Sequence, residues 1–218
     1  MDGLNHSFKA TLRLKERGEG MKTEIRYRQG RKEDCLQIAD LISTASGGVV
    51  DFLFHDLIPG MTPVQMVAHN LERDHPPHTY RNAIVAESEG FIAGMALSFP
   101  SHFHGITEGM KKFFPPDRLE HVRPYYSAPV GRSLFLDAIA VRDEYRGKGI
   151  GRGLVSLTQE KARKSGYDAL TLIAFAENRK ARRLYERMGF ETLEKIEIRP
   201  HELISYQGGC LLMRCPLL

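Results

Sequence analysis

The spacing of apolar and polar residues in the first part of the chain predicts one strand followed by two helices. Residues 23–28 (TEIRYR) alternate between apolar and polar side chains, which is the periodicity of a strand. Residues 32–43 and 63–73 carry apolar side chains at helical spacing. The pair Gly47 and Gly48 is expected to end the first of these helices.

A hairpin and a less regular segment follow. Residues 83–87 and 91–97 are apolar runs on either side of a short turn with Gly90, which predicts two antiparallel strands. Residues 100–132 are rich in proline and aromatic residues and have no clear period. We expect an irregular excursion there, with room for a short helix, and loops of this length tend to be functional.

The last part of the chain alternates between apolar strands and amphipathic helices. Gly166 and Gly189 are expected to end the two helices. The order strand, helix, strand, helix, strand, strand calls for a mixed sheet with helices packed on it. The expected strands are 134–141, 169–175, 192–198 and 209–215, and the expected helices are 151–165 and 179–188.

Length and composition indicate one folded domain. The 218 residues are 42% hydrophobic and 27% charged, close to the averages for globular proteins. Residues 1–20 are polar and charged, so we place an N-terminal extension there and the domain at 21–218. The chain has no apolar run of about 18 residues and no secretory h-region, which predicts a cytoplasmic protein without a membrane segment.

Charge and cysteine content exclude some classes of function. The net charge of +4 is spread along the chain, whereas nucleic-acid binding usually needs a clustered basic face. A local site for an anionic small molecule explains the charge more simply. The three cysteines form no CxxC pair, so we expect free thiols, and the histidines before residue 122 lack metal-ligand spacing, so we expect no metal.

The segment between residues 141 and 151 carries the chemistry that sequence alone can identify. It contains RDEYRGKGIG, in which glycines allow a ligand to approach the backbone, and it leads into the N-terminus of a helix. Unpaired N–H groups at a helix N-terminus bind phosphate, and Arg146, Lys148 and Arg152 add positive charge. A P-loop and a dinucleotide fingerprint both fail on the spacing of these glycines.

Two motifs resemble those of a known family. The segment 146–151 (RGKGIG), after the strand FLDAIAV, looks like the acetyl-CoA signature of the GCN5-related N-acetyltransferases (GNAT). The segment 178–190 (NRKARRLYERMGF) is similar to the family's second motif, N-x-x-A-x-x-L-Y-x-x-x-G-F. The resemblance covers roughly residues 134–192, and the rest of the chain is compatible with it.

The resemblance implies an α/β fold with a twisted, mostly antiparallel sheet of six to seven strands and flanking helices. Its central parallel strands, 134–141 and 169–175, would splay apart and admit the pantetheine arm of acetyl-CoA. Backbone groups of the first strand would bind the arm, and the glycine segment would bind the pyrophosphate. The implied cofactor-binding residues are Ile139, Ala140, Val141, Arg146, Gly147, Lys148, Gly149, Ile150, Gly151, Arg152 and Asn178.

Each proposed site residue also has a purely structural explanation. Asn178 suits a helix N-cap, and Tyr185 belongs to an apolar helical stripe typical of a core position. The resemblance implies that the Tyr185 phenol donates its proton to the departing thiolate. The ordinary pKa values of about 10 and 8.5 would make this transfer nearly matched.

A base is also needed, because an alkylammonium with a pKa near 10 is not a nucleophile at neutral pH. Residues 173–175 offer no carboxylate. Asp137 is the nearest candidate, although simple alternation places it on the face of Ile139 and Val141, and a structural hydrogen-bonding role is the alternative. Glu87 and ordered water are further candidates.

The function expected from these features is transfer of an acetyl group from acetyl-CoA to a primary amine of a small molecule or peptide. The alternative is a non-catalytic acyl-CoA-binding sensor or scaffold, favoured by the missing carboxylate in 169–175. The acceptor would lie against residues 31–80 and 100–132, whose composition does not identify it. A homodimer is compatible with the family resemblance.

Overall fold

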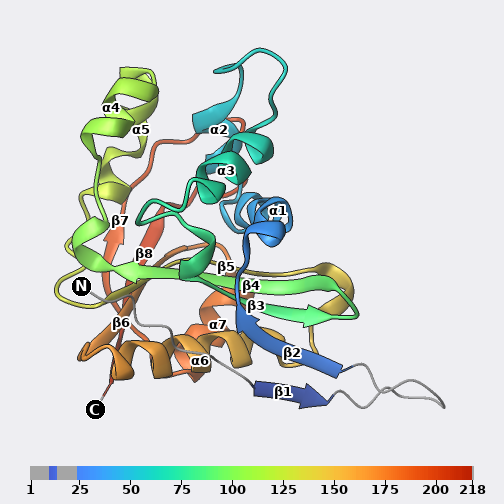
Figure 1. Ribbon diagram of the computed structural model, residues 1–218. Coiled ribbons are helices and arrows are strands. Elements are labelled where there is room, and N and C mark those ends of the chain that lie inside the picture. Colours follow the sequence, from blue (N-terminus) through green and yellow to red (C-terminus); the bar gives the residue numbers. More distant parts are fainter. Residues whose placement is uncertain (1–9, 14–23, 218) are drawn as a thin grey trace.

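The computed structural model describes residues 10–13 and 24–217, which form a single twisted sheet with helices on both faces (Figure 1). The sheet order is β1-β2-β3-β4-β5-β6-β8-β7, and β5 and β6 form the parallel pair among otherwise antiparallel neighbours. The strands are β1 (Ala10–Arg13), β2 (Glu24–Gln29), β3 (Ala83–Ser88), β4 (Phe91–Pro100), β5 (Leu134–Val141), β6 (Ala169–Phe175), β7 (Glu191–Ile196) and β8 (Cys210–Pro216).

The expected fold class is confirmed. Strands β2–β8 make the predicted seven, and β1, which comes from the range assigned to the extension, adds a short eighth strand at the edge. The rest of that extension lies outside the described residues. The helices are α1 (Cys35–Ala45), α2 (Val49–Phe54), α3 (Pro63–Glu72), α4 (Glu108–Phe113), α5 (Pro116–Tyr126), α6 (Ile150–Lys164) and α7 (Arg179–Arg187), with 3-10 turns at Lys32–Asp34, Tyr80–Asn82, Ser101–Phe103 and Asp143–Tyr145.

The sheet separates two apolar cores. One face packs against α6 and α7, where Ile150 and Leu154 are fully buried beside Leu136 of β5. The other face packs against α1 and α3, where Ile38 and Leu71 are fully buried. Figure 1 shows α6 and α7 on one side of the sheet and α1 to α3 on the other. The cysteines of the described chain are free and buried, as expected.

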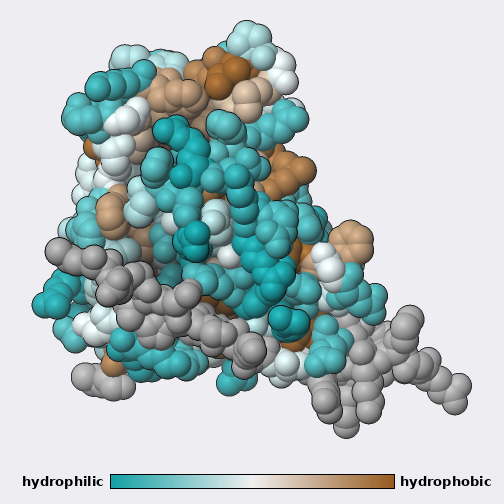
Figure 2. Space-filling model, viewed as in Figure 1, coloured by the Kyte–Doolittle hydropathy of each residue, from teal (hydrophilic) through white to brown (hydrophobic). Residues whose placement is uncertain are grey.

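The segment 100–132 is more regular than predicted. It forms α4 and α5, which pack with α2 around Phe52, Phe114 and Leu119. The two helices were not predicted individually because neither shows an apolar stripe. The helix α4 is short, and α5 is polar with Pro124 inside it. In Figure 2 apolar side chains gather at the end of the molecule where α4 and the segment after α2 lie.

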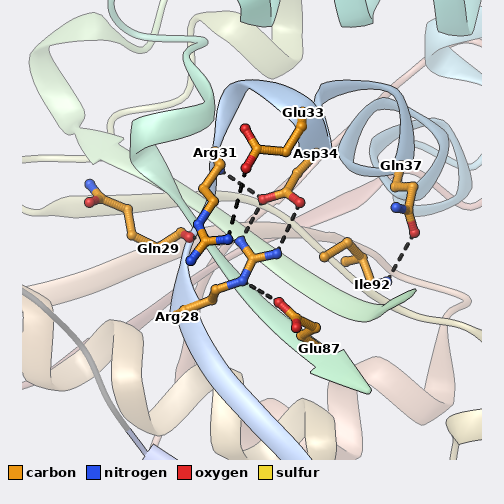
Figure 3. A network of polar contacts seen from close by, with 8 residues as sticks. All are labelled: Arg28, Gln29, Arg31, Glu33, Asp34, Gln37, Glu87 and Ile92. Carbon is orange, nitrogen blue, oxygen red and sulfur yellow. Dashed lines mark hydrogen bonds and ion pairs between the residues drawn. The ribbon is translucent and has the colours of Figure 1, made fainter. Parts of the chain in front are cut away.

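A buried ion-pair network joins the 3-10 turn before α1 to β2 and β3 (Figure 3). The Arg28 guanidinium donates to both carboxylate oxygens of Asp34, at 2.6 and 3.0 Å, and its Nε contacts Glu87. The Arg31 N–H donates to the same Asp34 carboxylate at 2.8 Å. Glu87 is therefore occupied as the counter-ion of Arg28, which argues against its role as a catalytic base.

Candidate functional site

The parallel pair opens into a cavity. Hydrogen-bonded pairing joins Leu134–Leu136 of β5 to Leu170–Leu172 of β6 and then stops. The carboxyl-terminal residues of both strands line a cavity of about 1980 Å³ that continues between α2, α3, α4 and α5. The predicted splay of the two strands is therefore present, and it forms one wall of this cavity.

A β-bulge turns Asp137 toward this cavity. In the β4–β5 ladder, Leu97 faces Ala138 but the next residue, Ser98, faces Leu136, so Asp137 is the extra residue of β5. Leu136 and Ile139 then both face the α6 core, while Ala138 packs on the α1 side. The alternation that placed Asp137 on the face of Ile139 is therefore wrong, because the bulge interrupts it.

The pairing of β5 with β4 determines which peptide groups of β5 face its open edge. The Arg142 N–H donates to the Ala93 carbonyl at 2.9 Å. Hydrogen-bonded pairs recur at every second residue of an antiparallel ladder, so Ala140 also bonds β4. The peptide groups of Ile139 and Val141 then point to the open edge of β5. Of the three β5 residues expected to bind the pantetheine arm, these two have their peptide groups on the side where the arm would lie.

The glycine segment adopts the backbone conformation that its sequence indicates. Gly147 and Gly149 have φ of +76° and +83°, a region that residues with a Cβ rarely adopt. Gly149 caps α6, and the first intrahelical bond is donated by the Gly153 N–H to the Gly149 carbonyl at 3.0 Å. The N–H groups of the preceding helical residues are left without an intrahelical partner, and such groups are the kind that bind anions at helix N-termini.

Two further glycines near the start of α6 differ in what surrounds them. A Cβ on Gly153 would lie 2.2 Å from the Tyr27 hydroxyl of β2, so Gly153 allows the sheet to approach α6. Gly151 lines the cavity, where its Cβ would lie 3.3 Å from Leu184. Packing against Tyr27 therefore explains the glycine at position 153.

The cations of the segment differ in their surroundings. Arg146 lines the cavity, and its Nε donates to the Val141 carbonyl at 3.0 Å while Asp143 pairs with its guanidinium at 2.7 Å. Arg152 also lines the cavity. Lys148 does not line it, since its ammonium lies over the Tyr145 ring, 5.4 Å from the centroid.

The second motif brings a helix cap and a buried tyrosine to the same cavity. The Asn178 side-chain oxygen accepts from the Ala181 N–H at 3.1 Å, which confirms the predicted N-cap of α7, and Asn178 lines the cavity. Tyr185 packs against Phe190 and also lines the cavity. Burial raises the pKa of its phenol above the ordinary value, so the hydroxyl keeps its proton. Within the described chain that hydroxyl makes no hydrogen bond.

Asp137 has a partner that sequence reasoning missed. The His78 Nε2 lies 3.4 Å from the Asp137 carboxylate, and the side chains are 41% and 17% exposed, respectively. His78 comes from the loop after α3 and packs its ring against Phe99. The two residues are 59 positions apart in the sequence, so no local pattern indicates their contact. The number of histidines before the glycine segment was the one hint.

Aromatic residues of α5 surround the same carboxylate. Burial, and secondarily the Asp137 charge, raise the pKa of the Tyr125 and Tyr126 phenols, so both stay neutral. The His104 Nε2–H donates to the Tyr125 carbonyl at 3.0 Å, and burial lowers the pKa of this histidine. The surroundings of the Asp137 carboxylate thus combine these two neutral phenols with the His78 imidazole.

A family model supports the assignment drawn from the motifs. The model described as "Acetyltransferase (GNAT) family" matches residues 51–190, which is more than half of the chain. The chain belongs to the GNAT family. The match extends well beyond the two motifs, over α2 to α5 as well as the cofactor elements.

The similar proteins agree on the fold and on part of the sequence. Mycothiol acetyltransferase of Jonesia denitrificans is 28% identical over 131 residues, 51% of this chain and 42% of that protein. Thialysine N-epsilon-acetyltransferase of Bos taurus is 36% identical over 72 residues, 33% of this chain and 42% of that protein. The chain thus spans less than half of each. A solved acetyltransferase superposes with a TM-score of 0.60 at 24% identity, covering 88% of this chain and 99% of that one.

Two further observations concern the described residues only. None of their helices is both long and apolar enough to cross a bilayer. No group of three or more His, Cys, Asp or Glu side chains among them could hold a metal ion.

Proposed function

We propose that this chain transfers an acetyl group from acetyl-CoA to the primary amine of an acceptor. The observation that carries the proposal is that one cavity contains the open edge of β5, the N-terminus of α6, the Tyr185 phenol and the Asp137 carboxylate. Acetyl-CoA would supply the activated acetyl thioester, and the chain would bind, orient and exchange protons.

The residues at the cavity fit this co-substrate. Its amide-containing arm needs donors and acceptors in an extended row, which the peptide groups of Ile139 and Val141 offer. Its diphosphate needs N–H groups and positive charge, which the backbone of 147–152 and the side chains of Arg146 and Arg152 offer. The Asn178 carboxamide nitrogen is a further donor on the same wall.

Asp137 and His78 are the proposed route for the acceptor's proton. A carboxylate beside a bound ammonium accepts its proton when the site is poorly hydrated, because burial disfavours the separated charges. The His78 imidazole contacts Asp137 and is the more exposed of the two, so it can pass the proton to water. The carboxylate expected but missing on β6 is thus replaced by one from β5. The argument for a non-catalytic binding module loses its support.

Tyr185 is the proposed acid at the leaving sulfur. Its phenol is protonated, lies in the cavity and has no other hydrogen-bond partner in the described chain. Burial raises the pKa of the phenol, which alone would make it a weaker acid. The same burial disfavours a thiolate, so the pKa values of donor and acceptor rise together and transfer remains feasible.

The proposal is tested by acetyl-CoA-dependent release of CoA across a panel of amines, with Tyr185→Phe as the diagnostic variant. We expect turnover on at least one amine, reduced by about a hundredfold in the variant. The affinity for CoA should stay nearly unchanged, because the substitution removes one oxygen. Equal losses of turnover and of CoA affinity would reject the acid role, and binding of CoA without turnover of any amine would reject the enzyme.

A further inference from the structure

The part of the cavity beyond Asp137 is built mainly from apolar side chains. It lies between α2, α3, α4 and α5, on the side of the sheet away from the glycine segment. Phe54 of α2 stands at 90° to Phe114, with ring centroids 4.9 Å apart, and Phe113 lies 5.0 Å from Phe114. Met66 of α3 and Met110 of α4 also line this region. We call it the aromatic chamber.

The rim of the aromatic chamber is apolar as well. Ile58, Phe103 and Phe113 all line the cavity and yet are 37%, 37% and 46% exposed. Large apolar side chains exposed around an opening cost solvation unless a ligand covers them, and such patches are typical of binding sites. Apolar residues are seen in Figure 2 at this end of the molecule.

Negative charge in the cavity is limited to two carboxylates. Asp137 and Glu177 are the acidic residues among its described lining, and Glu177 already accepts from the Gln207 N–H at 2.9 Å. Glu177 also directly precedes Asn178, at the end of the cavity assigned to the cofactor. An acceptor away from that end therefore meets one carboxylate of the described lining, Asp137. A second ammonium in the aromatic chamber would be buried without a counter-ion.

We propose that the acceptor is a small monoamine with an aromatic or bulky apolar body, in which the amine reaches Asp137 and the body fills the aromatic chamber. This inference rests on the proposed acetyl transfer. It disfavours polyamines and aminoglycosides, whose additional ammonium groups find no partner. Peptides are disfavoured too, because the mainly apolar lining offers few hydrogen-bond partners to the neighbouring peptide groups.

The experiment compares kcat/KM for phenethylamine, ethylamine, spermidine, kanamycin and a tetrapeptide with N-terminal phenylalanine, with the full chain and acetyl-CoA. Phenethylamine should exceed ethylamine by about 30- to 100-fold, the gain expected from burying one phenyl ring. It should exceed the two polycations by at least about a hundredfold. A polycation or the tetrapeptide as the best substrate would overturn the inference while leaving the acetyltransferase proposal intact.

A paired substitution tests the charge argument directly. Met110→Glu adds a carboxylate to the wall of the aromatic chamber, and Met110→Gln adds a polar side chain of the same size without the charge. The ratio of kcat/KM for spermidine to that for phenethylamine should rise on the order of tenfold in the Glu variant only. An equal rise in both variants would show that polarity, and not charge, selects the acceptor. If no amine reacts although CoA binds, both proposals fail together.

Discussion

Gly149 offers a test of whether the glycine segment binds a ligand or only turns the chain. Its φ of +83° lies in the left-handed region, and a Cβ placed there would meet no atom within 4 Å. Substitution by alanine therefore introduces backbone strain without a steric clash. That strain is about 1–2 kcal/mol for an L-residue in this conformation.

Gly166 provides a matched control at the other end of α6. Its φ is +73°, and a Cβ would again meet no atom within 4 Å. Gly149→Ala and Gly166→Ala should thus lose similar stability, about 1–2 kcal/mol each in chemical unfolding. Only Gly149 adjoins the N–H groups proposed to hold a diphosphate.

The two variants should differ in CoA affinity, measured by isothermal titration. The free Gly149→Ala protein can relieve its strain by leaving the left-handed region, and CoA binding then has to restore it. The cost of up to about 1–2 kcal/mol corresponds to a 5- to 30-fold weaker Kd. Gly166→Ala should keep the parent Kd. Equal Kd values for all three proteins would refute the role of Gly149 in ligand binding, as would equal weakening in both variants.

Three further substitutions test the remaining arguments. Asp137→Asn should lower turnover at neutral pH by about a hundredfold, and the loss in pH–rate profiles should shrink at high pH as more amine is unprotonated; a constant loss would argue for a structural role. Asp34→Ala removes the main partner of the buried Arg28 guanidinium, so it should lower the free energy of unfolding in urea by about 3–5 kcal/mol. Glu33→Ala, at the exposed neighbouring residue, should lower it by less than about 1 kcal/mol. Burial lowers the pKa of Lys161 to about 8, so above that pH the folded chain binds fewer protons than the unfolded chain and gains stability as pH rises. Between about pH 7.5 and 9.5 the free energy of unfolding should rise by about 2 kcal/mol more in the parent protein than in Lys161→Met. Equal slopes of stability against pH in the two proteins would refute this reasoning.

Much of the fold could be predicted because its strands carry local signals. The runs 134–141 and 169–175 were predicted with the bounds that β5 and β6 have, since both are apolar segments bounded by polar turns. The ends of α3, α6 and α7 followed from similar signals within one residue, and the hairpin was predicted too, although β4 runs three residues past its expected end. The short helix α2 was missed because six residues after a Gly-Gly pair show no helical period.

The acceptor side of the site could not be predicted in the same way, because it depends on contacts between distant segments. The helices α4 and α5 are held by burial of Phe114, Leu119 and Val122 against α2, not by a periodic pattern of their own. The contact of His78 with Asp137 likewise depends on how the loop after α3 crosses the sheet. The cofactor side of the site could be predicted because its turn and helix cap are encoded within a dozen consecutive residues.

The bulge in β5 links the unusual feature of the sequence to the proposed chemistry. In a regular strand Asp137 would face the same way as Ile139, into the core beside Ile150 and Leu154, where an unpaired carboxylate costs several kcal/mol. The extra residue in the ladder places Asp137 on the opposite face while Ile139 still faces the core. A single change of register thus keeps the core apolar and gives the cavity the Asp137 carboxylate. The aspartate within an apolar strand is therefore better explained by the site than by the packing of the sheet.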